Sequence, residues 1–146
     1  LLIDASTAHI VRTPERFDVI VATNFYGDIL SDLASELSGS LGLAGSMMAS
    51  DTNCCAQAQH GSAPDIAGQD RANPTSMILS VAMLLQWMGD HHGVAKVRKA
   101  GDAMEAAVDR VLENPGTRTV DLGGSLGCKA FGGAVAQALE AQARAS

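Results

Sequence analysis

Two aspartates, Asp28 and Asp32, stand four residues apart at the start of an otherwise apolar pattern, NFYGDILSDLASELSGSLG. On a helix their side chains lie about 40° apart around the axis, because successive residues turn by about 100°. The pair therefore shares one face, next to the apolar stripe of Ile29, Leu33 and Leu37. Such a face is either a solvated helix N-terminus or a site for a hard cation such as Mg²⁺ or Mn²⁺, which prefers carboxylate oxygens. Spacing alone favours the solvated helix end, since surface carboxylates are common.

A third carboxylate, Asp4, follows the short apolar run 1–3, which indicates a strand that ends at this aspartate. Asp4 adds an oxygen to the pair on the helix only if the fold brings it near. The spacing along the chain does not decide this.

The residues around these carboxylates alternate between strand-like and helix-like patterns, which is typical of an α/β architecture. The apolar, β-branched segment 17–22 indicates a buried strand, and 119–122 a short one. Segment 39–73 has few long apolar runs, and such a length without regular structure is usually a functional loop. We predict helices at 5–12, from Tyr26 to Gly39, and from Pro74 to either Gly89 or Gly93. Two more helices are expected at about 94–113, ended by Asn114-Pro115-Gly116, and at 131–143.

Composition excludes several classes of protein. The chain has 146 residues, of which 47% are hydrophobic, so it fits one folded domain or one piece of a larger protein. A net charge of -6 argues against a broad nucleic-acid surface, which needs clustered Lys and Arg. No apolar run is long enough for a membrane span, and three cysteines without a CxxC pattern favour a reducing, cytoplasmic environment.

Two long motifs, NFYGDILSDLASELSGSLGL and HGSAPDIAGQDRANP, resemble the isocitrate/isopropylmalate dehydrogenase family. The segments LLIDA, PERFDVIVATN, TRTVDLGG and KAF follow in the family's order, so the resemblance runs essentially to the C-terminus. Family members oxidise a 2-hydroxy acid with a nicotinamide cofactor and a divalent metal, and then decarboxylate it. The resemblance implies the C-terminal part of an isopropylmalate dehydrogenase-like α/β fold. Residues 1–40 would end the central dimerisation domain, and residues 41–146 would belong to the cofactor-binding domain.

The resemblance also assigns a metal site. It makes Asp28 and Asp32 ligands of Mg²⁺ or Mn²⁺, and Asp4 a third ligand that is presented across a homodimer interface to the partner's site. Bound there, the cation would stabilise negative charge on the oxygens of the 2-hydroxy acid. With the family in view, the metal interpretation of the aspartate pair becomes the stronger one.

The HGSAPDIAG segment resembles the family's adenosine site, which replaces the G-x-G-x-x-G fingerprint that this chain lacks. Asp65 would accept hydrogen bonds from the ribose and repel a 2′-phosphate, which favours NAD over NADP. From the local sequence alone, Asp65 is equally a turn residue after Pro64, and His60 can be structural. Asp121 either borders the cofactor or only holds the DLGG turn. The residues implied at the cofactor are His60, Gly61, Ser62, Ala63, Asp65, Ile66, Asn73 and Asp121.

The chain departs from the family pattern just before this segment. Many relatives read E-P-V there, where this chain has Gln57, Ala58 and Gln59. The change removes a negative charge near the nicotinamide end. We interpret it as the mark of a side branch that acts on a malate or tartrate analogue.

No catalytic residue can be assigned in this chain. The family uses substrate-binding arginines, a tyrosine acid and a lysine base, all of which precede the segment corresponding to Leu1.

The chain has no initiator Met and covers less than half of a family chain, which suggests a fragment, a processed product or an incomplete sequence. We therefore expect part of an NAD- and metal-dependent oxidative decarboxylase of a 2-hydroxy acid resembling 3-isopropylmalate, inactive alone. The alternative is a non-catalytic fragment or subunit that binds nucleotide or pairs with a catalytic chain.

Overall fold

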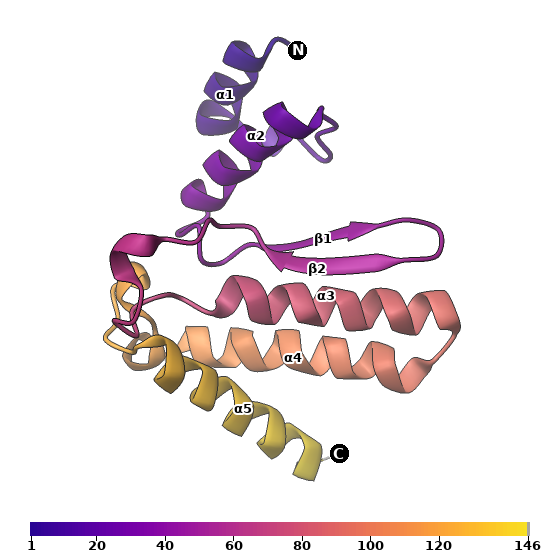
Figure 1. The fold of residues 1–146 in the computed structure, drawn as a ribbon, viewed down its shortest axis with the longest axis vertical. Coiled ribbons are helices and arrows are strands. Elements are labelled where there is room, and N and C mark those ends of the chain that lie inside the picture. The colour runs from indigo at the N-terminus through magenta and orange to yellow at the C-terminus, as the bar shows by residue number, and fades with distance from the viewer. Residues whose placement is uncertain (146) are drawn as a thin grey trace.

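The computed structural model describes residues 1–145, so the last position of the predicted segment 41–146 lies outside the described residues. A pair of N-terminal helices stands above a β-hairpin, and the hairpin lies on a layer of helices that ends with the C-terminal helix (Figure 1). The elements are α1 (Ile3–Arg12), α2 (Asn24–Leu37), β1 (Gly45–Ala49), β2 (Cys54–Ala58), α3 (Thr75–His92), α4 (Ala95–Glu113) and α5 (Cys128–Ala145). Single 3-10 turns, η1 to η4, occupy Pro14–Arg16, Pro64–Ile66, Pro115–Thr117 and Val120–Leu122. Within residues 1–145, none of the helices has the length and apolarity that a membrane crossing requires.

The core lies between α4 and α5. Phe131 of α5 is completely buried against Ala107 and Val108 of α4, and Val111 and Val135 close the cluster. Full burial of an aromatic ring contributes a large share of the hydrophobic stabilisation in a small domain. This cluster fixes α5, and with it the loops that lead into α5.

Helices α3 and α4 approach each other closely because glycines lie at their contact. A Cβ atom on Gly89 would come within 2.3 Å of the backbone nitrogen of Arg98, and one on Gly101 within 2.6 Å of the Ala82 carbonyl oxygen. Neither backbone atom can move without shifting a helix. Gly93 ends α3 in the left-handed region, with φ of +67°, and lets the chain reverse into α4. The small residues therefore set the spacing of this antiparallel pair.

The β-hairpin covers α3 through small residues and buried hydroxyl groups. The strands are antiparallel, with Gly45 opposite Ala58 and Ala49 opposite Cys54. The hydroxyl of Ser80, which is fully buried on α3, accepts from the Ser46 backbone N–H at 2.9 Å. A two-stranded hairpin is only marginally stable by itself, so these ties to α3 hold it in place.

The structure confirms the predicted helices and corrects three other expectations. Residues 1–3 are not a strand, because α1 begins at Ile3 and takes Asp4 into its first turn. Residues 119–122 are not a strand, because Val120–Leu122 form the turn η4 and Thr119 before it makes a single β-bridge with Leu126. Segment 39–73 is not structureless, because strands β1 and β2 lie inside it.

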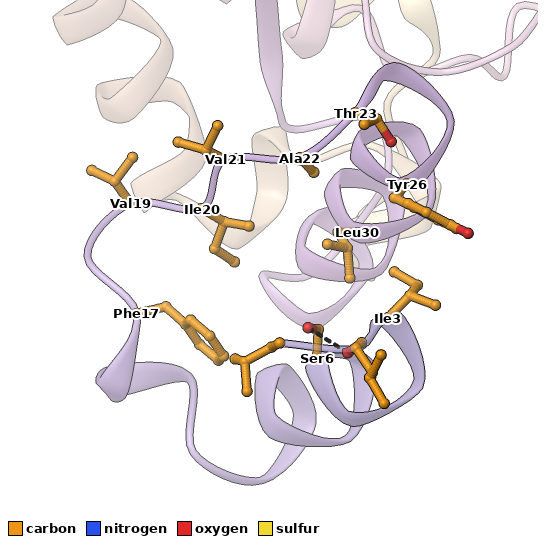
Figure 2. A pocket seen from close by; sticks show the side chains of 12 residues that line it. Ile3, Ser6, Phe17, Val19, Ile20, Val21, Ala22, Thr23, Tyr26 and Leu30 are labelled. Carbon is orange, nitrogen blue, oxygen red and sulfur yellow. Dashed lines mark hydrogen bonds between the residues drawn. The ribbon is translucent and has the colours of Figure 1, made fainter.

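The predicted strand at 17–22 is also wrong. The segment is extended after Phe17, but no described strand pairs with it, and Val19 and Val21 are 78% and 93% exposed. With α1 and α2 it forms an open apolar groove of about 550 Å³, into which Ile20 and Leu30 point (Figure 2). The apolar side chains that led to the prediction of a buried strand therefore line an open groove in this chain.

The glycines at the α3–α4 contact give a stability test. We expect Gly101→Ala to lower the free energy of unfolding by about 1–3 kcal/mol, because the new methyl group overpacks the interface. Gly133→Ala on α5 is the matched control, since nothing lies within 4 Å of its Cβ position. It should raise stability by about 0.5–1 kcal/mol through helix propensity. Urea denaturation of both variants measures the difference, and equal effects would contradict the close packing.

Candidate functional site

Helix α2 presents Asp28 and Asp32 to an open cleft. Both side chains are exposed, and the cleft, of about 470 Å³, lies between α2 and the hairpin. Neither carboxylate forms an ion pair with a lysine or arginine of residues 1–145. Ser31, Gly45, Ser46, Met47, Gln57, Gln59 and Met83 complete the lining. Two carboxylates without an ion-pair partner, beside an open and polar cleft, fit Mg²⁺ or Mn²⁺, which keeps several waters and leaves positions for a substrate.

Asp4 does not join this pair within the chain. It lies in the first turn of α1, where its Oδ1 accepts from the backbone N–H of Ala5 at 2.8 Å. Across the described part of the chain, no three His, Cys, Asp or Glu side chains are close enough to share a metal ion. Within one chain, Asp4 therefore does not supply a third oxygen to Asp28 and Asp32. Its presentation across a dimer interface stays a prediction.

A second cavity, of about 650 Å³, lies beside the loop that follows β2. A cavity of this size accommodates a small molecule or one end of a dinucleotide. Seven of the eight predicted cofactor residues line it: His60, Gly61, Ser62, Ala63, Ile66, Asn73 and Asp121. Asp65, the eighth, is exposed on η2 and is not part of the lining. The structure thus brings together residues that the sequence separates by up to 61 positions, from His60 to Asp121.

The wall formed by residues 60–66 has an uncommon backbone. Ala63 adopts the left-handed region with φ of +43°, where a residue with a side chain pays of order 1 kcal/mol. The turn is held by the backbone N–H of Ile66, which donates to the Ala63 carbonyl at 3.1 Å. Small side chains at Gly61, Ser62 and Ala63 leave this backbone accessible from the cavity.

Asn73 and Asp121 form a connected pair at the cavity. Asn73 is buried, and its Nδ2 donates to Asp121 Oδ2 at 2.9 Å while its Oδ1 accepts from the Thr75 backbone N–H at 3.0 Å. The second bond satisfies a free donor in the first turn of α3. The Ser40 hydroxyl also donates to Asp121, at 2.5 Å. Asp121 therefore both borders the cavity and holds the junction of three segments.

The environment of Asp121 favours its charged form. Burial by itself raises the pKa of this carboxyl, but the hydrogen bond from Ser40 opposes it. The side chains of Thr119 and Asn73 add to that effect, although the Thr119 hydroxyl makes no hydrogen bond of ordinary geometry. The net result is a pKa below the ordinary aspartate value.

The structure adds residues to the cavity that the motifs did not indicate: Leu41, Gly42, Ala67, Gly68, Asp70, Arg71, Ala72, Cys128 and Lys129. Asp70 is the most informative, because its carbonyl and its Oδ1 each accept a backbone N–H at 3.0 Å from the start of α5, at Cys128 and Lys129. A carboxylate at a helix N-terminus is favoured by the helix dipole. No local pattern indicates this cap, since its partners lie 58 and 59 residues away in sequence.

Solved structures with this fold are β-decarboxylating dehydrogenases and their relatives. The isocitrate dehydrogenase of Methylococcus capsulatus matches 95% of this chain with a TM-score of 0.87 and 38% identity. A β-decarboxylating dehydrogenase of Thermococcus kodakarensis matches 96% of it, with a TM-score of 0.74 and 38% identity. This chain covers 40% and 39% of those two chains. The isopropylmalate dehydrogenase-like fold that the motifs predicted is confirmed.

The sequence profile of the isocitrate/isopropylmalate dehydrogenase family matches residues 1–135, and the chain belongs to this family. Its relatives include an isocitrate/homoisocitrate dehydrogenase of Thermus thermophilus, which is 50% identical over 140 residues. A 3-isopropylmalate dehydrogenase of Parasynechococcus marenigrum is 45% identical over 144 residues. These matches cover 96% and 95% of this chain but 40% and 38% of the relatives. The chain therefore spans about 40% of the length of these relatives.

The lowered pKa of Asp121 predicts a pH-dependent contribution to stability. Because the folded state favours the carboxylate, the stabilisation is present above the unfolded pKa of about 4 and is lost as the pH falls through the lower folded value. Asp121→Asn replaces a charged acceptor with a neutral one, so we expect it to cost about 1 kcal/mol at pH 7, an amount limited by partial exposure.

The measurement is urea denaturation at pH 7 and at the lowest pH at which the wild-type protein still folds. The difference between wild type and variant should shrink at the lower pH, because protonation of the Asp121 carboxylate removes the charge that distinguishes the two proteins. Asp109→Asn, an exposed change on α4, is the control and should be nearly neutral at both pH values. If Asp121→Asn lowered the free energy of unfolding equally at both pH values, the stabilisation would depend on the shape of the side chain and not on its charge.

Proposed function

We propose that this chain is part of an NAD- and divalent-metal-dependent enzyme that oxidises a 2-hydroxy acid and removes CO₂ from it. The observation that carries the proposal is that two cavities adjoin consecutive segments of the chain, the β1–β2 hairpin and the loop that follows it. One contains the paired carboxylates of α2, and the other gathers seven of the predicted cofactor residues. A redox enzyme of this kind needs a metal-bound substrate and a dinucleotide close to each other.

In the first cavity, Asp28 and Asp32 would hold Mg²⁺ or Mn²⁺. When bound, the ion would supply positive charge next to the substrate oxygens, where negative charge develops during oxidation and decarboxylation. The two aspartates act by fixing its position, because they lie one turn apart on the same rigid helix. A third carboxylate, Asp4 of a second copy in a homodimer, would complete the protein ligands.

In the second cavity, the loop of residues 60–73 would hold the adenosine half of NAD. The small residues Gly61 and Ala63 allow a ligand to approach the backbone closely. Arg71 and Lys129 place positive charge in the same wall, which suits the phosphates of a dinucleotide. Asp65 does not line the cavity but lies in sequence between two residues that do, Ala63 and Ile66. Its carboxylate suits the ribose hydroxyls of NAD better than a 2′-phosphate.

The remaining machinery would come from outside this chain. In this proposal residues 1–40 end a central, dimer-forming domain and residues 41–146 belong to the cofactor domain. The acid, the base and the arginines that grip the substrate carboxylates would lie in the rest of the protein. The relatives are named for isocitrate, homoisocitrate and 3-isopropylmalate. We propose a substrate resembling 3-isopropylmalate, with malate and tartrate analogues as further candidates.

The metal ligands are tested by Asp32→Asn in the complete protein that contains this chain. NAD reduction is followed with 3-isopropylmalate, isocitrate, homoisocitrate, malate and tartrate, with and without Mn²⁺. We expect Mn²⁺-dependent turnover of at least one substrate, and a loss of at least about 100-fold in kcat/KM in the variant, since charge stabilisation in the transition state is lost. Glu36→Gln, one turn further along α2, is the matched control and should keep most of the activity. No turnover with any substrate, while nucleotide still binds, would favour the non-catalytic alternative.

The choice of nucleotide is tested by Asp65→Lys. The substitution removes an acceptor for the ribose hydroxyls and adds a charge that attracts a 2′-phosphate. We expect NAD to bind about tenfold more weakly and NADP more tightly, as measured by titration calorimetry. Asp51→Lys, the same change at the exposed end of the hairpin, controls for net charge. Unchanged affinity for both nucleotides would remove Asp65 from the site.

A further inference from the structure

Gln59 lines the cleft that contains Asp28 and Asp32, and the next residue, His60, lines the second cavity. Gln59 lies directly after β2 and directly before His60, the first residue of the cofactor loop. Its backbone N–H donates to the Ser76 hydroxyl of α3 at 3.2 Å. Its side chain extends towards α2, where Nε2 donates to the Ser35 hydroxyl at 2.8 Å. Gln59 is therefore anchored on α3 while it reaches the helix that carries the aspartate pair.

The hydrogen bonding continues from Ser35 into the metal cleft. Ser35 is 5% exposed, and its hydroxyl donates to the Ser31 carbonyl at 2.8 Å. Ser31 lies between Asp28 and Asp32 in sequence and lines the same cleft as both of them. A buried hydroxyl that is satisfied on both sides holds its neighbours in a defined arrangement.

This link matters because few other contacts orient α2. Among the helices and strands, α2 packs mainly against α1, and its contacts with the hairpin and the other helices are sparse. The connection after α2 is tied at Ser40, which bonds Asp121. The bond from Gln59 to Ser35 is thus the side-chain contact that fixes the middle of α2 against the hairpin.

We propose that Gln59 and Ser35 are a positioning pair that couples dinucleotide binding in the 60–73 loop to cation binding at Asp28 and Asp32. A dinucleotide bound to the loop fixes the position of the chain from Gln59 onwards. Through its hydrogen bond to Ser35, Gln59 then restrains the position of α2 and of the two aspartates on it. Coupling between two sites is reciprocal, so the cation tightens dinucleotide binding by the same factor. The inference rests on the proposed function, because it presupposes both ligands.

The test measures Mn²⁺ affinity of the full-length protein with and without saturating NAD, by electron paramagnetic resonance of free Mn²⁺. NAD should tighten Mn²⁺ binding in the wild-type protein. The coupling is the dissociation constant of Mn²⁺ without NAD divided by the dissociation constant of Mn²⁺ with NAD. In Gln59→Ala this ratio should fall about fivefold, the value expected for one neutral hydrogen bond. A general loss of Mn²⁺ affinity, or of folded protein, changes both measurements by the same factor. It therefore leaves the ratio unchanged and is distinguished from a loss of coupling.

Two further variants, Ser35→Ala and the combination of Ser35→Ala with Gln59→Ala, complete a double-mutant cycle. Ser35→Ala should reduce the ratio by the same factor, and the double variant should reduce it no further, since both changes remove one bond. Gln137→Ala, the same truncation at an exposed position of α5, should keep the wild-type ratio. A wild-type ratio in Gln59→Ala, with both ligands still bound, would overturn this inference alone. Absence of Mn²⁺ or NAD binding in the unmodified protein would overturn the proposed function as well.

Discussion

The rest of the structure depends on the hydrogen bonds at the start of α3. There, Asn73 satisfies the Thr75 backbone N–H and holds Asp121, while the buried hydroxyl of Ser76 donates to the Ala44 carbonyl and accepts from Gln59. Unsatisfied polar groups in such positions would each cost about 1–3 kcal/mol. The first turn of α3 therefore serves as the common attachment point of the hairpin, the loop of residues 60–73 and the Asp121 turn.

The chain therefore has a well-packed part, formed by α3, α4, α5 and the hairpin, and a part with few contacts to it, which contains α2. Helices α3, α4 and α5 share a core around Phe131, and the hairpin is bound to α3 by buried serines. Helix α2, in contrast, is joined to this body by few contacts. A carboxylate pair on a helix with few contacts to the rest of the chain suits a site whose halves must approach each other when ligands bind.

The sequence indicated the helices well and the strands poorly. Helical periodicity is a local property, and Gly93, Pro115 and the glycine after α2 mark ends that the structure confirms. Apolar runs misled the strand predictions, because a strand requires a partner and segment 17–22 has none among residues 1–145. The hairpin was missed for the opposite reason: GSMMA and CCAQA are too short and too rich in small residues to show an alternating pattern, and their pairing becomes stable only against α3.

By itself the sequence determined the family and the helical segments, and it proposed candidate site residues, since motifs and periodicity are readable along one chain. Only the tertiary structure decided which of them meet. It gathered His60, Asn73 and Asp121 at one cavity, left Asp4 away from the aspartate pair, and joined Gln59 to Ser35 across 24 residues. The reason is physical: such contacts arise from packing between distant segments, and their free energy depends on burial and geometry that no local spacing encodes.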